Sequence, residues 1–148
     1  REKKAVEDVY QLLRGAKVDC VAAEDIEAEI WRKYIFNCAY NVLTAHYRQN
    51  VGELRADAKK REEFRRLLQE AYEVGKAKGV HLEEEDIVRH QNRFENKLAD
   101  DATSSLQRDV EDGKHNTELE TFCGYIVRVG RELGVDVSLT EKFYRMDS

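Results

Sequence analysis

One stretch of the chain combines an apolar helical pattern with a short row of polar side chains that could bind or protonate a ligand. Residues 30–45, IWRKYIFNCAYNVLTA, are apolar nearly all the way round a helical projection, which is typical of a helix buried in a protein interior. Lys33, Asn37 and Asn41 follow one another at four-residue steps, and with Thr44 they fall within an arc of roughly 80°. Burying an ammonium is costly unless it is paired, hydrogen-bonded or in contact with water. We therefore expect this row to form the wall of a pocket.

Two further candidate residues lie in the first turns of later predicted helices. The sequence SSLQ at 104–107 has the form of a capping box with Ser104 as the cap, so Ser105 should lie beside unpaired backbone N–H groups. Such a place suits a carboxylate or a phosphate. The sequence TELE at 117–120 has the same form, and the helix dipole there favours an ionised Glu118. Taken alone, either residue also fits an ordinary capping role.

Other kinds of site find little support in the sequence. His81, Glu85 and His90 do not all share the four-residue phase that a helical metal pair needs, so we expect no metal site. There is no GxGxxG and no GxxxxGK[ST] motif to hold a nucleotide phosphate. The basic residues between 59 and 66 alternate with glutamates, and we interpret them as a solvated helix face rather than a phosphate site.

Length and composition indicate one globular domain. The chain has 148 residues, of which 41% are hydrophobic and 37% charged, with a net charge of −5. The acidic balance argues against a nucleic-acid-binding protein, and no apolar run is long enough to span a membrane. Cys38 and Cys123 lie in apolar helical runs, where a buried free thiol is the ordinary state. We therefore expect a cytoplasmic protein.

The elements that must position the candidate residues are all predicted to be helical, about seven helices around a long buried central one. Asp25 is the expected N-cap of the central helix, which should run to about Ala45. Gly124 and Gly130 interrupt the helix after residue 117, and we expect a neighbouring backbone to approach them closely. The other predicted segments are helices at 2–13, 58–78, 84–98, from 104 and at 139–146, an extended segment at 18–21 and a looser stretch at 51–54.

The candidate residues resemble, in order and spacing, those of the C-terminal helical domain of the ketopantoate reductases. That family has Trp-x-Lys followed by two asparagines at four-residue steps, then Ser-Ser-Met-x-x-Asp, then Thr-Glu-Ile-Asp with a glycine after it. The corresponding residues of this chain are Trp31-Arg32-Lys33, Asn37 and Asn41, Ser104-Ser105-Leu106-Gln107-Arg108-Asp109, and Thr117-Glu118-Leu119-Glu120 with Gly124.

The resemblance implies a fold, a partner domain and a reaction. The fold would be a helical domain of the 6-phosphogluconate dehydrogenase C-terminal-like kind over residues 25–148. Residues 1–24 would be the end of an N-terminal Rossmann domain, or its connecting helix, and that domain would bind NADPH. The whole enzyme would reduce a small 2-oxo acid, ketopantoate, to pantoate on the route to pantothenate and coenzyme A, and a homodimer is compatible with it. This chain by itself would then be inactive.

The resemblance also implies a role for each candidate residue. Lys33 would be the general acid, and Asn37 and Asn41 would hydrogen-bond the substrate and position the lysine. Ser105 would hold the substrate carboxylate, and Glu118 would contact the substrate hydroxyl or the nicotinamide end of the cofactor. The chemistry agrees, because hydride addition builds negative charge on a ketone oxygen and a partly desolvated lysine can supply the proton.

Some positions depart from the family pattern. Val42 stands where the family has proline, Leu106 where it has methionine and Lys114 where it has arginine, and one extra residue lies between Asp109 and Thr117. These positions are on the substrate side, so the substrate would be ketopantoate or a related 2-oxo acid.

A second hypothesis is a non-catalytic helical interaction module. In that case the lysine–asparagine row would be a structural hydrogen-bond network in the core. Under the reductase hypothesis, by contrast, separation from the partner domain should leave an apolar face exposed near Trp31.

Overall fold

The computed structural model describes residues 20–113 and 118–147, and within these ranges the chain is helical without a strand. This confirms the predicted all-α class. There are seven α-helices and two π-helical segments in the described ranges: α2 (Cys20–Tyr47), α3 (Val51–Arg55), α4 (Ala58–Ala77), α5 (Glu84–Asn92), η1 (Arg93–Lys97), α6 (Ser105–Glu111), η2 (Glu120–Gly124), α7 (Tyr125–Leu133) and α8 (Ser138–Asp147).

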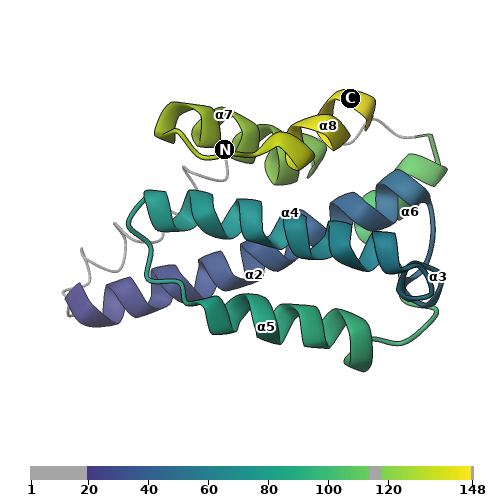
Figure 1. Cartoon of the computed structure of the whole chain (residues 1–148), viewed down its shortest axis with the longest axis horizontal. Coiled ribbons are helices and arrows are strands. Elements are labelled where there is room, and N and C mark those ends of the chain that lie inside the picture. Colours follow the sequence, from purple (N-terminus) through teal and green to yellow (C-terminus); the bar gives the residue numbers. More distant parts are fainter. Residues whose placement is uncertain (1–19, 114–117, 148) are drawn as a thin grey trace.

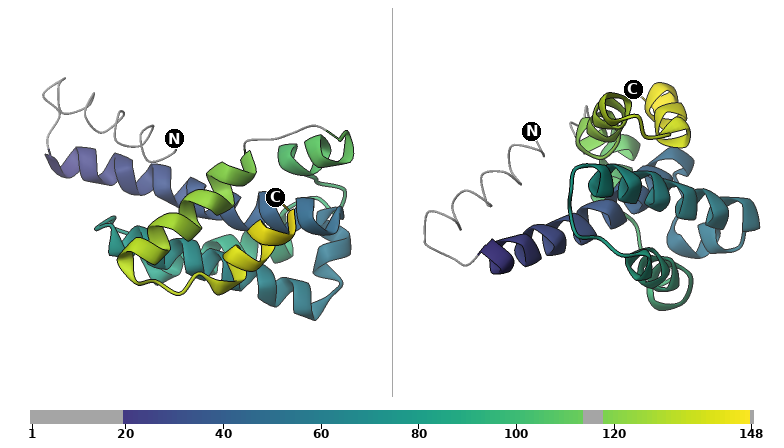
Figure 2. Two further views of the ribbon diagram at one scale, coloured as in Figure 1. Left: turned by 90° about the horizontal axis from the view of Figure 1, so that it is seen from above. Right: turned by 60° about the vertical axis from the view of Figure 1, so that its left-hand side comes forward.

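Helix α2 lies at the centre of the domain, as its apolar sequence predicts. It packs most extensively against α4, and then against α6 and η2. Figure 1 shows α7 and α8 on one side of this central pair and α5 on the other, and the views in Figure 2 agree. Trp31, Ile35 and Leu43 are at most 1% exposed, and they belong to the same buried cluster as Phe64 and Ile126. Between Ile30 and Ala45, burial on nearly every side explains why few polar residues lie outside the one row.

The central helix is longer than predicted. Within the described residues it runs from Cys20 to Tyr47, so Asp25 is not its N-cap and residues 20–21 are helical rather than extended. Between Gly15 and Gly52 there is no glycine or proline to interrupt a helix, and Ala22 and Ala23 favour one. The chain leaves the helix at Arg48, whose φ of 53° is left-handed. The helix predicted at 2–13 lies outside the described residues.

The stretch expected to be loose at 51–54 is the short helix α3. Its N-cap is Asn50, whose side chain accepts a hydrogen bond from the backbone N–H of Glu53 at 2.9 Å. The Glu53 carboxylate in turn accepts from the backbone N–H of Asn50 at 3.1 Å. This is a complete capping box, and the Asn-x-x-Glu sequence signalled it.

Most of the other predicted elements are confirmed. Helix α4 ends before Gly79 and α7 ends at Gly134, and both glycines have positive φ, 89° and 72°. Helices α5 and η1 together cover the predicted helix at 84–98, and α8 covers that at 139–146. The capping box predicted at Thr117 falls on a residue outside the described ranges.

The close approaches predicted at Gly124 and Gly130 are made by side chains, not by a neighbouring backbone. A Cβ at Gly130 would lie 2.7 Å from Cγ1 of Val137, and one at Gly124 would collide with the Glu120 carboxylate. Val137 is buried and begins the turn into α8. Gly130 therefore allows the loop after α7 to fold back against that helix.

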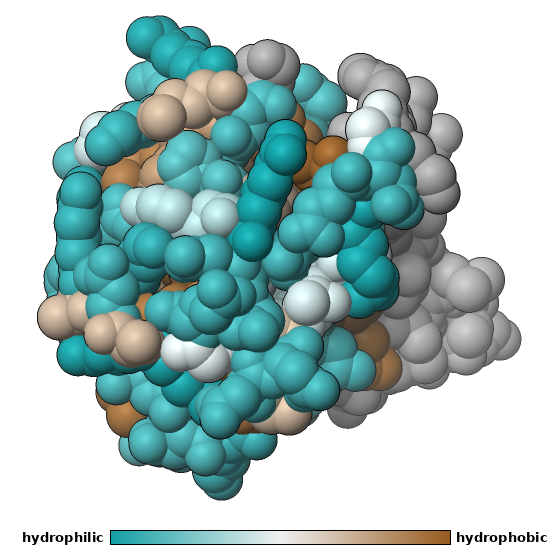
Figure 3. Space-filling model, turned by 90° about the vertical axis from the view of Figure 1, so that its right-hand side faces the viewer, coloured by the Kyte–Doolittle hydropathy of each residue, from teal (hydrophilic) through white to brown (hydrophobic). Residues whose placement is uncertain are grey.

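Trp31 is only 1% exposed, so it does not itself contribute to the apolar surface expected near it. The large hydrophobic side chains exposed within the described ranges are scattered along the chain: Ile26, Val88, Leu133 and Met146. On the face shown in Figure 3, hydrophilic residues predominate and hydrophobic ones form separate small patches. Among the helices of the described ranges, none has the length and apolarity that crossing a membrane requires.

Candidate functional site

The polar row of α2 runs from the surface into the interior. Lys33 is exposed, Asn37 is half-buried, Asn41 is 6% exposed and Thr44 is fully buried. The Nδ2 of Asn41 donates to the Oδ1 of Asn37 at 3.2 Å. Burial therefore increases along the row from Lys33 to Thr44. Only the inner half of the row, Asn41 and Thr44, is removed from solvent by this chain.

Two later elements bring Ser105 and Glu118 to the inner half of this row. The Oγ of Ser105 lies 3.0 Å from both carboxylate oxygens of Glu118 and 3.5 Å from the Oδ1 of Asn41. The hydroxyl has one proton, and the shorter, charge-assisted contact with the carboxylate is the stronger one. We therefore infer that the Ser105 hydroxyl donates its hydrogen bond to Glu118 rather than to Asn41. The structure thus brings together Asn37, Asn41, Ser105 and Glu118 in one chain of polar contacts.

A buried hydrogen bond between Thr44 and Ser104 sets the position of Ser105. The Oγ1 of Thr44 donates to the carbonyl of Tyr40 at 2.7 Å and lies 2.7 Å from the Oγ of Ser104. Because the Thr44 proton is used in the first bond, Ser104 donates in the second. Ser104 also accepts from the backbone N–H of Gln107 at 3.1 Å, which is the N-cap that the sequence predicts for α6. With α6 held against α2 in this way, the next residue, Ser105, lies beside Asn41.

Only the cap half of the predicted box at 104–107 is formed. The side chain of Gln107 donates to Glu111, four residues along α6, at 3.3 Å. Because Thr44 is fully buried and bonded to Ser104, it is a structural residue of the interface between α2 and α6 and not part of a pocket wall.

Lys33 differs from the other four candidates. Within the described ranges its ammonium forms neither an ion pair nor a hydrogen bond, and its side chain is exposed. The described helices therefore do not supply the partial desolvation that suits a lysine acting as an acid. Lys33 lines an open polar pocket of about 440 Å³ between the first half of α2 and the start of α5. Asn37 and Asn41 do not line this pocket. The other lining residues are Glu29, Arg32, Glu83, Asp86, Arg89 and His90.

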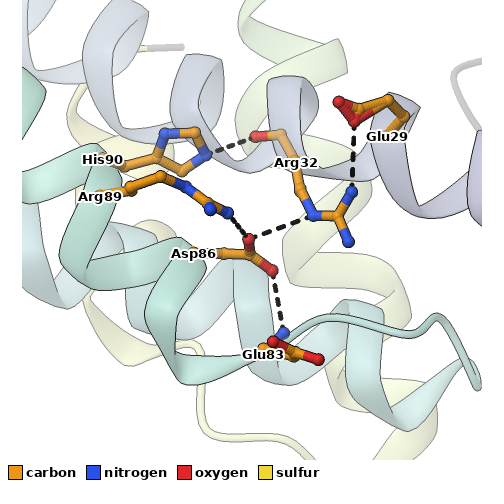
Figure 4. A network of polar contacts seen from close by, with 6 residues as sticks. All are labelled: Glu29, Arg32, Glu83, Asp86, Arg89 and His90. Carbon is orange, nitrogen blue, oxygen red and sulfur yellow. Dashed lines mark hydrogen bonds and ion pairs between the residues drawn. The ribbon is translucent and has the colours of Figure 1, made fainter.

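Asp86 is the centre of the polar network in this pocket (Figure 4). It is 2% exposed, and it accepts from the Nε of Arg32 at 3.1 Å, from the backbone N–H of Glu83 at 2.9 Å and from Arg89. Three donors, two of them cationic, compensate the burial of this carboxylate. The network joins α5 to the turn of α2 that carries Lys33.

His90 makes the second link between α5 and this turn. Its Nε2 is 2.8 Å from the carbonyl oxygen of Arg32, and because a carbonyl can only accept, Nε2 carries the proton (Figure 4). Burial lowers the pKa of His90 below its usual value, so the neutral ring is favoured. The ring also packs against Phe36, with a centroid distance of 5.2 Å.

Sequence reasoning missed the group formed by Arg32, Asp86 and His90. Arg32 and Asp86 lie 54 residues apart, and no periodicity relates them. The capping position of Asp86, three residues after Glu83, was the one local signal of its role. The sequence suggests for His90 only the role of a metal ligand. Within the described ranges no group of three or more His, Cys, Asp or Glu residues could hold a metal ion.

Residues 25–146 match the family model described as ketopantoate reductase PanE/ApbA C terminal. A 2-dehydropantoate 2-reductase from Archaeoglobus fulgidus is 34% identical over 90% of this chain and 44% of its own length. One from Salmonella typhi is 29% identical over 92% of this chain and 43% of its own length. The chain thus spans less than half the length of these relatives.

Solved structures agree in fold. The dimeric ketopantoate reductase from Staphylococcus aureus superposes with a TM-score of 0.75 at 26% identity, covering 82% of this chain and 42% of that one. A D-mandelate dehydrogenase with NADH and anilino(oxo)acetate has a TM-score of 0.72 at 21% identity, a likeness of fold alone, covering 82% and 40%. The family match extends over most of the chain and includes the α2 row, Ser105 and Glu118. This chain therefore belongs to the ketopantoate reductase PanE/ApbA C-terminal family.

Proposed function

We propose that this chain is the substrate-binding and catalytic-acid domain of an NADPH-dependent 2-oxo acid reductase, which reduces ketopantoate to pantoate or acts on a related 2-oxo acid. A nucleotide-binding Rossmann domain at its N-terminal side would hold most of the cofactor. The greater length of the relatives supports this arrangement. The proposal includes a cytoplasmic location and, by similarity to the dimeric S. aureus enzyme, the pairing of two copies.

The observation that carries the proposal is the combination of an unpaired Lys33 with a linked polar group on the same face of α2. Asn37, Asn41, Ser105 and Glu118 are joined by contacts of 3.0 to 3.5 Å. Lys33 lies one helical turn before Asn37 and has no partner within the described ranges. The unpaired ammonium of Lys33, next to this group of ordered polar side chains, is suited to bind a ligand with an anionic or polarised oxygen.

In the proposed reaction a nicotinamide cofactor, when bound by the partner domain, would supply the hydride for the ketone carbon. The ammonium of Lys33 gives its proton to the ketone oxygen, on which negative charge develops, and the product is an alcohol. The domain and substrate that cover Lys33 would exclude water, which strengthens its interaction with the developing alkoxide. Asn37 and Asn41 would orient the substrate as uncharged hydrogen-bonding groups.

The hydrogen bond between Ser105 and Glu118 suggests how these two residues would share the substrate. To bind the substrate carboxylate, the Ser105 hydroxyl must turn its proton away from Glu118. The Glu118 carboxylate would then no longer accept from Ser105 and would instead accept from the hydroxyl of the product or contact the nicotinamide end of the cofactor. Substrate binding would thus exchange one charge-assisted hydrogen bond for two others.

The test is a substrate panel of 2-oxo acids with NADPH, applied to the protein that includes its nucleotide-binding domain. Lys33→Ala should lower kcat about a hundredfold or more, the usual size of a general-acid effect. The matched control is Lys59→Ala, which removes an exposed lysine of α4.

Two results would contradict the proposal. Turnover that is unchanged in Lys33→Ala would remove the role assigned to the lysine. The absence of NADPH oxidation with every 2-oxo acid would instead support the alternative, a helical interaction module in which the Asn37–Asn41–Ser105–Glu118 contacts are structural.

A further inference from the structure

The helical turn that follows Glu118 is a π-helix, whose hydrogen bonds span five residues instead of four. Segment η2 covers Glu120–Gly124, and the backbone N–H of Tyr125 bonds to the carbonyl of Glu120, five residues earlier. An α-helix would direct that N–H to the carbonyl of Thr121. Short π-helical insertions frequently occur at functional sites, and this one begins two residues after Glu118.

Side chains from two other helices hold this π-helical turn. The hydroxyl of Tyr34, on α2, donates to the carbonyl of Thr121 at 2.6 Å. The hydroxyl of Tyr144, on α8, donates to the carboxylate of Glu120. Gly124 leaves room for that carboxylate, because a Cβ at this position would collide with it. The turn is therefore attached to both α2 and α8.

Tyr34 is itself fixed by the aromatic rings around it. Its side chain is buried, and its ring meets that of Trp31 edge-on at a centroid distance of 5.1 Å. The rings of Phe122 and Tyr125 each lie 6.1 Å from it. Because Phe122 belongs to the π-helical turn, Tyr34 both packs against this turn and bonds to it. The bond therefore sets the position of the turn relative to α2.

The segment that carries Glu118 meets α2 at two places. Glu118 precedes Thr121 by three residues, about one helical turn. Thr121 bonds to Tyr34, whereas Glu118 accepts from Ser105, which lies 3.5 Å from Asn41. Tyr34 and Asn41 are seven residues apart, so they share one face of α2. One attachment is thus direct, and the other passes through Ser105.

We propose that Tyr34 is a positioning residue, whose bond to Thr121 holds the π-helical turn so that the Glu118 carboxylate stays at Ser105. Its meaning for catalysis rests on the proposed function. A change from π-helical to α-helical bonding would rotate Glu118 by about 100° relative to the rest of its helix, the rotation of one residue. Tyr34 directly follows Lys33, so one turn of α2 would carry both the proton donor and the anchor of the glutamate.

The first measurement needs no turnover. In the ¹³C-labelled protein, the resonance of the Glu118 carboxyl carbon is identified by its loss in Glu118→Gln, and Ser105→Ala shows where it moves when the Ser105 bond is absent. Tyr34→Phe keeps the ring, removes the hydroxyl and should move the resonance toward its position in Ser105→Ala. The matched control is Tyr47→Phe, which removes another α2 hydroxyl, bonded to Glu63 of α4, and should leave the resonance in place.

The second measurement is steady-state kinetics of the complete enzyme with a 2-oxo acid. Tyr34→Phe should lower kcat/KM about tenfold, the usual size of the loss of one hydrogen bond to a charged group. In the Glu118→Gln background the same substitution should cost less than about twofold, because the group that Tyr34 positions is already absent. Tyr47→Phe should change kcat/KM in neither background.

Three results would overturn the inference. They are a Glu118 resonance that does not move in Tyr34→Phe, a kcat/KM that this substitution leaves unchanged, and a loss that is equally large without the Glu118 carboxylate. In the last case Tyr34 would act through the fold as a whole. If the wild type reduces no 2-oxo acid, the proposed function fails, and the resonance alone then decides whether Tyr34 holds Glu118 at Ser105.

Discussion

At the scale of single residues, two adjacent serines have different environments and therefore different expected roles. Ser104 is 4% exposed, caps α6 and bonds to the buried Thr44, whereas Ser105 is exposed and contacts Glu118. The first hydroxyl stabilises the interface between α2 and α6. Under the proposed function, the second hydroxyl would exchange its present partner for the substrate carboxylate.

Alanine substitution should separate these roles. Ser104→Ala should lower the free energy of unfolding by about 1–2 kcal/mol, because it removes an N-cap and leaves a buried threonine oxygen with one bond fewer. Ser105→Ala should leave stability within about 0.5 kcal/mol of the wild type. In the complete enzyme it should raise KM for the 2-oxo acid roughly tenfold, because a bond to a charged group is lost. Urea unfolding and steady-state kinetics measure the two effects; a loss of stability in Ser105→Ala would make that residue structural.

At the scale of elements, a buried carboxylate joins two helices that are distant in sequence. Glu70 of α4 is 8% exposed and accepts from the backbone N–H groups of Leu139 and Thr140 at 3.0 and 2.7 Å, and from the Thr140 hydroxyl at 2.6 Å. The first turn of α8 is thus capped by a side chain some 70 residues earlier in the chain. An anion at this end also suits the helix dipole.

Glu70→Ala should loosen α8 from the domain. We expect the free energy of unfolding to fall by about 1–3 kcal/mol, because buried N–H groups at the start of α8 lose their acceptor. Hydrogen exchange at Leu139 and Thr140 should accelerate more than exchange in α4. Glu62→Ala, at an exposed position of the same helix, is the control and should change neither quantity. Equal protection of α8 in Glu70→Ala and the wild type would contradict this capping role.

At the scale of the whole molecule, α2 makes the described domain a single packing unit. Its buried residues share one cluster with residues of α4, α5, α7 and α8. Trp31, the one tryptophan of the chain, lies in that cluster and is 1% exposed. Its fluorescence therefore reports on the packing of the core, while far-ultraviolet circular dichroism reports on all helices together.

The two signals should follow the same urea unfolding curve. Loss of the contacts of α2 removes the surface against which the other helices pack, so they should not persist without it. A midpoint for Trp31 fluorescence that differs from that for circular dichroism would show that part of the bundle unfolds separately.

The same preparation should fail to oxidise NADPH with any 2-oxo acid, because the proposed hydride donor binds to another domain.

The sequence alone determined the helical class, the central position of α2 and most of the helix limits. These follow from local rules, since the all-round apolar pattern of residues 30–45 requires burial and left-handed glycines end α4 and α7. The start of α2 was misjudged because Asp25 resembles a cap, although no residue near it stops a helix. The order and spacing of Lys33, Asn37, Asn41, Ser105 and Glu118 were also readable, and they led to the family that the comparisons confirm.

Only the tertiary structure decided which of those residues meet. It brought Ser105 beside Asn41 through the buried hydrogen bond between Thr44 and Ser104, and it left Lys33 exposed beside a pocket. Such contacts join positions up to tens of residues apart, so no periodicity encodes them. They depend on how helices pack and on which donors and acceptors burial then forces to pair.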